Sequence, residues 1–483
     1  MVQDMDYRKC IVEAVNGNRS VIENDVHRLR YHLMPPTGLL NDPNGLIHYK
    51  GLYHVFFQWN PFGTKHGSKS WGHYVSQNLA EWTLEEAALV PDQWYDKDGC
   101  YSGSAVEHEG KMYLFYTGNV KNERNERSTY QCLAVSDDGM NFEKRGPVLN
   151  LPEGYTPHFR DPKVWKEGSR WLMVLGAQNI SGRGEAVLAQ SPDLEEWEFL
   201  GPVAGSDIDG LGEFGYMWEC PDLFRLNGTD VLIVCPQGLA AAGDFYQNLY
   251  QAGYFTGSFD AGKVSFEHGA FSELDRGFDF YAPQTMQDDT GRRIMVGWMG
   301  MTDDREQSHP TLSSNWIHAL TLPRVLGVKA GKIIQKPVPE LETLRGAETR
   351  YELNMHPSEI CTETVSPASE IAVNFDESLK NGFEMEIRKD IRIVFQNGKF
   401  TVERDTFDKT GREQRAVELE CLDKLQIYLD HSSAEIFVNA GEEVFTCRFF
   451  PDAENNDISI GVSEKHTVEF CQWPLERDSI RLY

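Results

Sequence analysis

The sequence predicts an all-β fold, in which a five-bladed β-propeller is followed by a C-terminal β-sandwich. Three observations lead to this fold class. Short apolar runs rich in β-forming residues are separated by Gly, Asn and Asp turns along most of the chain. One unit recurs five times up to about residue 340. Beyond it, short strands with alternating apolar and polar residues continue without the repeat.

The repeated unit consists of a polar motif, a short apolar strand, a glycine turn and a second apolar strand. Its turn glycines lie 59, 58, 60 and 63 residues apart by subtraction, and they are Gly51, Gly110, Gly168, Gly228 and Gly291. Further strand-like pieces complete each unit, so four strands per unit is the natural count. Five such units arranged radially describe a propeller, which leaves only short, protected strand edges.

The repeat divides the chain into three segments. We expect residues 1–30 to form a lead segment that packs on the propeller, residues 31–340 to form the propeller itself as the catalytic domain, and residues 341–483 to form the sandwich. The connector after residue 340, ELETLRGAETRYELN, has some helical tendency. Within the sandwich, Asn397-Gly398 is the turn signal of a two-residue β-hairpin.

The composition limits the class of protein. The formal net charge of −28 disfavours a nucleic-acid partner or an anionic membrane surface. No apolar stretch approaches the ~20 residues of a transmembrane helix. The start of the chain, MVQDMDYRKCIVEAVNG, lacks the pattern of a secretory signal, so we expect a cytoplasmic protein. The nine cysteines contain no C-x-x-C pair, so neither a disulfide framework nor a zinc site is expected.

Three acidic residues share the position at which the repeats begin. Counted back from the turn glycine, Asp42 and Glu219 lie at −9 and Asp161 lies at −7. The first strand of each propeller blade lines the central axis, so these carboxylates from blades one, three and four are expected to face one cavity. Close carboxylates repel one another unless their pKa values are pushed apart, which is what acid/base catalysis requires.

The local sequences suggest how the pKa values divide. Asp42 lies in a turn rich in amide donors, which would keep its carboxylate ionised, whereas burial beside Trp218 would raise the pKa of Glu219. An ionised nucleophile and a protonated acid form the pair that a retaining glycosidase uses. Asp161 follows Arg160, and an ion pair between the two would keep Asp161 ionised, suited to binding sugar hydroxyls and stabilising positive charge.

Aromatic rings and polar donors are expected around the same cavity, as in other pockets for small sugars. The predicted substrate-binding residues are Asn41, Gln58, His66, Trp71, Tyr101, Ser102, Arg160 and Trp298.

Six motifs, in this order along the chain, resemble glycoside hydrolase family 32. They are Asn41-Asp42-Pro43-Asn44-Gly45, Phe57-Gln58-Trp59-Asn60-Pro61, Trp71-Gly72-His73, Tyr101-Ser102-Gly103-Ser104-Ala105, Arg160-Asp161-Pro162 and Glu219-Cys220-Pro221-Asp222. Within the family the chain is most similar to bacterial sucrose-6-phosphate hydrolases and intracellular sucrose hydrolases. The resemblance covers nearly the whole chain, because HSSAEIFVNAGE also resembles the family's sandwich domain.

The resemblance implies a retaining β-fructofuranosidase that hydrolyses sucrose or sucrose 6-phosphate and releases fructose. Asp42 would attack the anomeric C2 of the fructosyl unit, and Glu219 would protonate the leaving glucosyl oxygen and later activate water. Asp161 and Arg160 would hold the fructosyl ring. The implied partner is a small sugar, with no nucleic acid or membrane, and no metal or organic cofactor is needed.

Alternatives remain at this point. One is an exo-fructanase acting on levan or inulin, another is a fructosyltransferase, and a third is a sugar-binding propeller without catalysis. The sequence does not indicate an oligomeric state. It departs from several relatives at Lys65, His66 and Lys69, where a tryptophan is replaced by a basic cluster. This cluster predicts a contact with the phosphate of sucrose 6-phosphate, and its other interpretation is a solvated loop.

Overall fold

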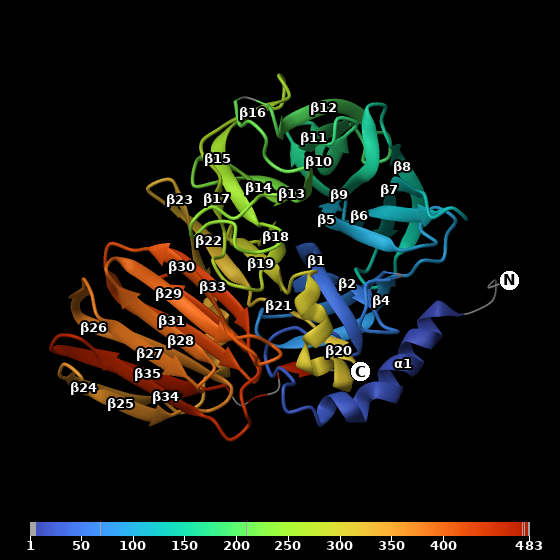
Figure 1. The fold of residues 1–483 in the computed structure, drawn as a ribbon. Helices are drawn as coiled ribbons and strands as arrows, with labels where there is room; N and C mark the ends of the chain where they lie inside the picture. Colours follow the sequence, from blue (N-terminus) through green and yellow to red (C-terminus); the bar gives the residue numbers. More distant parts are fainter. Residues whose placement is uncertain (1–5, 68, 209, 476, 478, 482–483) are drawn as a thin grey trace.

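Strands dominate the computed structural model, which describes residues 6–67, 69–208, 210–475, 477 and 479–481. The all-β fold class is thereby confirmed (Figure 1). Residues 1–5 of the expected lead segment and residues 482–483 of the expected sandwich lie outside the described part of the chain. No helix among the described residues is both long enough and apolar enough to cross a membrane.

The lead segment contains the helix α1 (Tyr7–Glu23). Asp6 caps its N-terminus, where the side chain accepts a hydrogen bond from the Lys9 amide at 3.2 Å. Ile11 and Val15, one helical turn apart, are buried in a core that also contains strands of the first sheet. Arg8 donates to the carbonyl oxygens of residues 87 and 88, which ties the helix to the end of that sheet.

Five sheets follow, each starting with a strand from one sequence repeat. The first sheet has the order β20 (Trp316–Ile317), β1 (Gly38–Tyr49), β2 (Leu52–Asn60), β3 (Ser70–Ser76), β4 (Trp82–Leu89) and β36 (Ile480–Arg481). The second contains β5 (Cys100–His108), β6 (Lys111–Lys121), β7 (Arg127–Ser136) and β8 (Glu143–Asn150). The third contains β9 (Tyr155–Glu167), β10 (Arg170–Asn179), β11 (Gly184–Ser191) and β12 (Glu198–Gly205).

The other two of these sheets carry short additional strands. The fourth contains β13 (Met217–Leu226), β14 (Thr229–Gln237), β15 (Gly253–Asp260), β16 (Ser265–His268) and β17 (Ser272–Glu273). The fifth contains β18 (Tyr281–Gln287), β19 (Arg293–Met299), β21 (Ala319–Leu320), β22 (Arg324–Lys329) and β23 (Lys332–Pro337). Two 3₁₀ helices, η1 (Asp304–Ser308) and η2 (Pro310–Ser314), precede β20.

The first strands of the five sheets form a closed ring. β1 contacts β5, β5 contacts β9, β9 contacts β13, β13 contacts β18, and β18 contacts β1. Figure 1 looks into this ring, with the five first strands nearest its centre. Equivalent positions of different repeats are therefore brought together around one axis.

Distant parts of the chain close the first sheet. β20 pairs in parallel with β1, through Gly38↔Trp316, and β36 pairs in parallel with β4, through Trp82↔Ile480. The sheet is thus flanked on one side by a strand that follows the fifth sheet and on the other by a strand from the far C-terminal end.

The C-terminal part consists of two six-stranded sheets. One has the order β24 (Thr349–Met355), β35 (His466–Pro474), β26 (Ser369–Leu379), β31 (Leu422–Asp430), β32 (Ser433–Val438) and β33 (Glu443–Arg448). The other has the order β25 (Ile360–Thr364), β34 (Asp457–Val462), β27 (Phe383–Ile387), β28 (Ile391–Gln396), β29 (Lys399–Asp405) and β30 (Arg412–Glu418).

One apolar core contains residues of both C-terminal sheets, including Ile371 and Ile427 of one and Met385 and Ile460 of the other. The predicted hairpin turn joins β28 to β29, and Asn397 has φ 53° there. The connector that precedes these sheets forms a short 3₁₀ helix, η3 (Pro339–Leu344), and its second half is strand β24 instead of helix.

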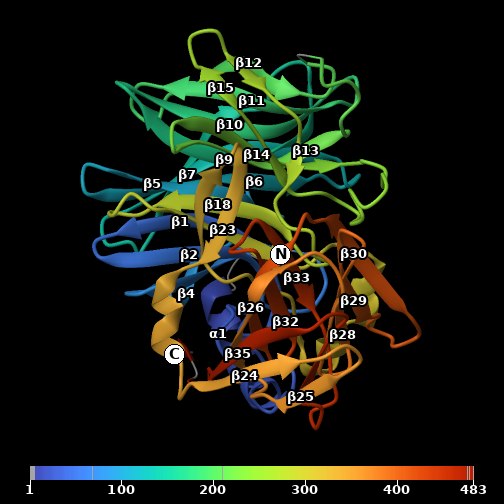
Figure 2. The same ribbon diagram turned by 90° about the vertical axis from the view of Figure 1, so that its left-hand side faces the viewer.

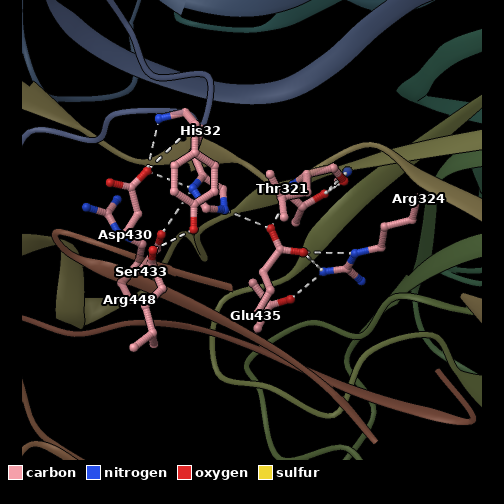
Figure 3. Close-up of polar contacts among 12 residues, drawn as sticks. His32, Thr321, Arg324, Asp430, Ser433, Glu435 and Arg448 are labelled. Carbon is pink, nitrogen blue, oxygen red and sulfur yellow. Dashed lines mark hydrogen bonds and ion pairs between the residues drawn. The ribbon is translucent and has the colours of Figure 1, made fainter. Parts of the chain in front are cut away.

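The two parts meet through a cluster of buried charges, which we call the interface cluster: His32, Arg324, Asp430, Glu435 and their hydrogen-bonding partners (Figure 3). His32 lies between two carboxylates, with Nδ1 3.0 Å from Asp430 and Nε2 3.0 Å from Glu435. Arg324 donates to Glu435 through Nε at 3.0 Å and Nη2 at 2.6 Å. Figure 2 shows the C-terminal sheets against the ring, where β33 contacts β19 and β23.

Candidate active site

A cavity of about 540 Å³ opens at one end of the ring. All three predicted catalytic carboxylates line it. So do the predicted binding residues Asn41, Gln58, His66, Tyr101, Ser102, Arg160 and Trp298. Trp71 is the exception, because its fully buried ring lies behind the wall, where Nε1 donates to the Tyr101 carbonyl at 3.0 Å. Trp71 therefore supports the strand that carries Tyr101 and does not line the cavity.

The first strand of each sheet runs from this cavity toward the opposite end of the ring. There a second cavity is lined by later residues of the same strands, such as Val164, Asp222 and Thr285. Along each first strand, earlier residues are consequently nearer the mouth of the active-site cavity. Glu219 thus lies nearer the mouth than Cys220, and Arg160 nearer than Asp161.

Each first strand is bulged where it passes the cavity. The ladder register shifts between Leu40 and Pro43, Tyr101 and Gly103, Arg160 and Lys163, Glu219 and Asp222, and Tyr281 and Gln284. The bulges contain Asp42, Ser102, Asp161, Cys220 and Ala282, which we call the bulge layer. The residues just before them, Asn41, Tyr101, Arg160, Glu219 and Tyr281, form the outer layer. Bulges commonly re-aim side chains beside active sites.

Three members of the bulge layer have left-handed backbone conformations. Asp161 has φ 63°, Cys220 φ 47° and Ala282 φ 47°, and each is followed by proline. Such conformations cost L-residues about 1–2 kcal/mol each. This strained backbone turns the Cys220 amide toward Asp161, to which it donates at 3.0 Å. The Asp161 amide in turn donates to the Thr117 hydroxyl at 3.1 Å.

Asp42 is held by donors on both oxygens. Ser102 Oγ donates to Oδ2 at 2.6 Å and Asn41 Nδ2 donates to Oδ1 at 3.0 Å. Burial nevertheless raises the pKa of Asp42, and the charge of Glu219 adds to the increase against the Ser102 hydrogen bond. The predicted donors are present, but their effect on the pKa is smaller than that of burial.

Glu219 accepts four hydrogen bonds. Arg160 donates to Oε1 through Nε at 3.0 Å and Nη2 at 2.6 Å, while Gln237 at 2.6 Å and Tyr281 at 2.7 Å donate to Oε2. Burial, the largest single influence, raises the pKa of Glu219, but Arg160 and Tyr281 together lower it overall. The prediction that burial leaves this pKa raised is wrong, because Arg160 and Tyr281 bind the ionised carboxylate of Glu219.

The predicted ion pair between Arg160 and Asp161 is correspondingly loose, with 4.0 Å between Arg160 Nε and Asp161 Oδ2. Burial raises the pKa of Asp161 to about 7, partly opposed by Arg160 and reinforced by Glu219 and Asp42. The expectation that Arg160 keeps Asp161 ionised is therefore also wrong. Neighbouring side chains on an extended strand point in different directions, and Arg160 points toward the fourth sheet.

The basic cluster at Lys65, His66 and Lys69 does not present three free cations. Lys69 is buried and donates to the Asn41 side-chain oxygen at 2.5 Å, and burial lowers its pKa to about 7 against the charges of Asp42 and Glu306. His66 Nε2 lies 3.0 Å from Glu306, whose other partner is His318 at 2.8 Å. Lys65 is exposed and does not line the cavity.

Tyr281 and Gln237 were not among the predicted site residues, although both contact Glu219. The sequence around Tyr281 could have identified it as a site residue. Tyr281-Ala282-Pro283 has the same place in the fifth repeat as Arg160-Asp161-Pro162 and Glu219-Cys220-Pro221 have in theirs. Gln237 ends the apolar run of β14, and only the folded sheet brings it to Glu219.

Two family models match the chain. The one described as "Glycosyl hydrolases family 32 N-terminal domain" matches residues 32–337, and "Glycosyl hydrolases family 32 C terminal" matches residues 340–474.

Two relatives that match over nearly their whole length carry the same name. The sucrose-6-phosphate hydrolase of Bacillus subtilis (strain 168) is 50% identical over 474 residues, which cover 98% of this chain and 99% of that protein. The sucrose-6-phosphate hydrolase of Klebsiella pneumoniae is 45% identical over 468 residues, with 96% and 97% covered.

Solved structures agree with the fold along the whole chain. The sucrose-6-phosphate hydrolase of Lactobacillus gasseri superposes with a TM-score of 0.88 at 31% identity, covering 99% of this chain and 98% of that one. A Bombyx mori family 32 beta-fructofuranosidase mutant in complex with sucrose superposes with a TM-score of 0.85 at 33% identity, covering 99% and 100%.

Proposed function

The chain belongs to family 32 of the glycosyl hydrolases, and from this premise we propose a retaining β-fructofuranosidase that hydrolyses sucrose or sucrose 6-phosphate and releases fructose. One observation carries the proposal beyond family membership. Three carboxylates line one cavity: Asp161 is buried, and Asp42 and Glu219 are partly buried. Their different partners give them different affinities for protons. Such differentiation is what a double-displacement glycosidase needs.

Asp42 is the proposed nucleophile. Its place in the bulge layer puts it deep in the cavity, where the fructosyl unit would bind and its anomeric C2 would be attacked. Hydrogen bonds from Ser102 and Asn41 orient the carboxylate for that attack. Breaking the glycosidic bond forms a fructosyl ester with Asp42, and hydrolysis of the ester by water restores the configuration at C2.

Glu219 is the proposed acid/base. In the outer layer it is nearer the mouth than Asp42, which fits protonation of a glucosyl oxygen that leaves toward solvent. Burial is already the strongest influence on its pKa. A bound sugar excludes the remaining water, which strengthens this effect and favours the protonated acid. After glucose departs, ionised Glu219 accepts a proton from the attacking water.

Asp161 and Arg160 are the proposed binding pair for the fructosyl hydroxyls. Asp161 lies in the bulge layer, held by the amide of Cys220, and ionised it would stabilise the positive charge that develops on the fructosyl ring. Asn41, Gln58, Tyr101, Ser102, Trp298 and His66 complete the proposed sugar-binding wall.

For the architecture we propose a five-bladed propeller over residues 31–340, preceded by a lead segment at 1–30 and followed by a β-sandwich segment at 341–483. The end of that last segment returns to the first sheet of the propeller as β36. The closed ring of first strands and the two C-terminal sheets sharing one core support this division. We also propose a cytoplasmic location, in keeping with relatives whose names specify a phosphorylated sugar.

A side-by-side assay with sucrose, sucrose 6-phosphate and inulin tests the function. We expect fructose to be released from sucrose and sucrose 6-phosphate. When first observed by NMR, the newly formed fructose should have the anomeric configuration that it has in the substrate. Preferential release from inulin would instead support an exo-fructanase, and new oligofructosides at high sucrose would support a fructosyltransferase. Binding of sugar without any hydrolysis would overturn the proposal.

A further inference from the structure

Two cationic side chains at the mouth of the cavity, Lys121 and Arg127, have no role in the proposed reaction. Lys69 and Arg160 also line the cavity, but they are bound to Asn41 and Glu219. Lys121 and Arg127 line it as well, and neither forms an ion pair with a carboxylate in the described part of the chain. Free cations beside an active site stand out in a protein with a formal net charge of −28.

The fold holds these two cations side by side. Lys121 ends β6, Arg127 begins β7, and the two residues are directly opposite each other in the antiparallel ladder. Like charges placed directly opposite on a sheet are destabilising. A shared anion would relieve that repulsion.

The hairpin that carries the pair extends over the mouth. Tyr101 of the outer layer pairs with Thr117, so the strand continues from Thr117 past the cavity wall to Lys121. The Arg127 guanidinium lies over the Tyr101 ring, 5.6 Å from its centroid. The nearby carboxylate of Asp98, which also lines the cavity, accepts a hydrogen bond from the Lys121 backbone amide at 2.6 Å. The side-chain ammonium of Lys121 remains available.

The direction in which the substrate lies connects this pair with a phosphate. If the proposed function holds, fructose occupies the deep end beside Asp42, and the glucosyl unit lies beyond Glu219 toward the mouth. A phosphate on the glucosyl 6-hydroxyl is then the outermost group of the substrate. Arg provides a planar fork for phosphate oxygens and Lys a mobile point charge.

We propose that Lys121 and Arg127 bind the 6-phosphate of the leaving glucosyl unit and thereby determine the preference for sucrose 6-phosphate over sucrose. The inference rests on the proposed function and assigns to the second sheet the role that the sequence suggested for Lys65, His66 and Lys69. Of those residues, Lys65 is exposed outside the cavity, His66 is paired with Glu306, and Lys69 is buried against Asn41.

The test compares Lys121→Met, Arg127→Met and the double variant with wild type on both substrates. Removing either charged side chain should lower kcat/KM for sucrose 6-phosphate about tenfold or more, because a charge-assisted hydrogen bond to the phosphate disappears. The value for sucrose should stay within about twofold. Arg124→Met is the matched control, because Arg124 is exposed at the tip of the same hairpin and does not line the cavity. It should change neither value.

Product inhibition gives a second measurement. The inhibition constant of glucose 6-phosphate should rise in the double variant, while that of glucose should not change. Equal losses on both substrates, or unchanged discrimination in the double variant, would overturn the inference and leave the proposed function intact. A wild-type enzyme that hydrolyses neither substrate would overturn the function, and this inference with it.

Discussion

Two charge clusters in this molecule, the buried interface cluster and the partly buried active site, differ in how completely their charges are matched. In the interface cluster, Glu435 accepts hydrogen bonds from His32, Arg324 and the Leu322 amide, and Asp430 accepts them from His32 and the amides of residues 30 and 31. In the active site, three carboxylates face one another with Arg160 as their principal cation, and its guanidinium donates to only one of them.

The pKa values follow this difference. Burial raises the pKa of Asp430, but its bonds with His32 lower it overall, to about 2. Burial raises that of Asp161 to about 7 without equal compensation. The matched charges of the interface cluster stay ionised and fix how the C-terminal sheets pack against the ring. In the active site the unmatched charges leave the Asp161 carboxyl with a pKa near neutrality, at a cost in stability.

The largest test removes the proposed nucleophile or acid/base. Asp42→Ala and Glu219→Ala should each lower kcat at least about 10⁴-fold, since the covalent step or its protonation is lost. Both variants should fold, which thermal unfolding checks. Azide should partly restore turnover of an activated fructosyl donor by the Glu219 variant only. Activity near wild type in the Asp42 variant would contradict the mechanism.

Neutralising a carboxylate of the active site should stabilise the fold, whereas neutralising one in the interface cluster should destabilise it. Asp161→Asn should lower kcat about 10²-fold or more, because its charge acts mainly in the transition state. It should also stabilise the fold by about 1 kcal/mol, since one of three facing carboxylates is neutralised. Steady-state kinetics and denaturant unfolding measure the two effects. An unchanged kcat would leave Asp161 a structural residue.

The interface cluster should respond in the opposite way. Glu435→Gln leaves Arg324 without its main counter-charge and should lower the free energy of unfolding by about 3 kcal/mol. Activity per folded molecule should stay near wild type, because the cluster does not line the active-site cavity. Glu442→Gln is the control, because Glu442 forms a surface ion pair with Lys329. This substitution should lower the free energy of unfolding by less than about 1 kcal/mol.

His32 gives the interface cluster a pH dependence. Burial lowers its pKa, but the bonds and charges of Asp430 and Glu435 raise it overall, above its usual 6.5. The stabilisation is therefore fully present below about pH 6.5 and is lost as pH rises through the higher folded pKa. Asp430 limits the acid side, since its contribution is lost below its unfolded pKa near 4. The melting temperature of His32→Gln should therefore approach wild type as pH rises above 7. A constant difference would contradict this assignment.

The smallest expected effect belongs to Lys69, which orients Asn41 toward Asp42. Lys69→Met should lower kcat/KM about tenfold on sucrose and sucrose 6-phosphate alike, because the contact lies on the fructosyl side. Loss of the positive charge should raise the pKa of Asp42, so the acid limb of the pH profile moves to higher pH. Lys65→Met is the control. If kcat/KM fell for sucrose 6-phosphate only, the phosphate would be bound by Lys69 and its neighbours, as the sequence suggested.

Much of the fold could be predicted because each repeat carries its own strand and turn signals, and turn glycines such as Gly51 and Gly110 mark their period. The carboxylates of the candidate site followed from the same period. Their pKa order did not, because it depends on where Arg160 points, and a bulge decides this. Burial of Lys69 and of Trp71 likewise depends on packing between strands that the sequence does not place.

The pairing of β36 with β4 has a consequence for how the molecule is made. Trp82 can pair with Ile480 only after almost 400 further residues have been synthesised, so this edge of the first sheet stays uncovered at the ribosome for all of that time. Contacts of such sequence separation form slowly and leave unpaired strands open to aggregation meanwhile. Nascent chains should therefore benefit from chaperones until residues 480 and 481 have emerged from the ribosome.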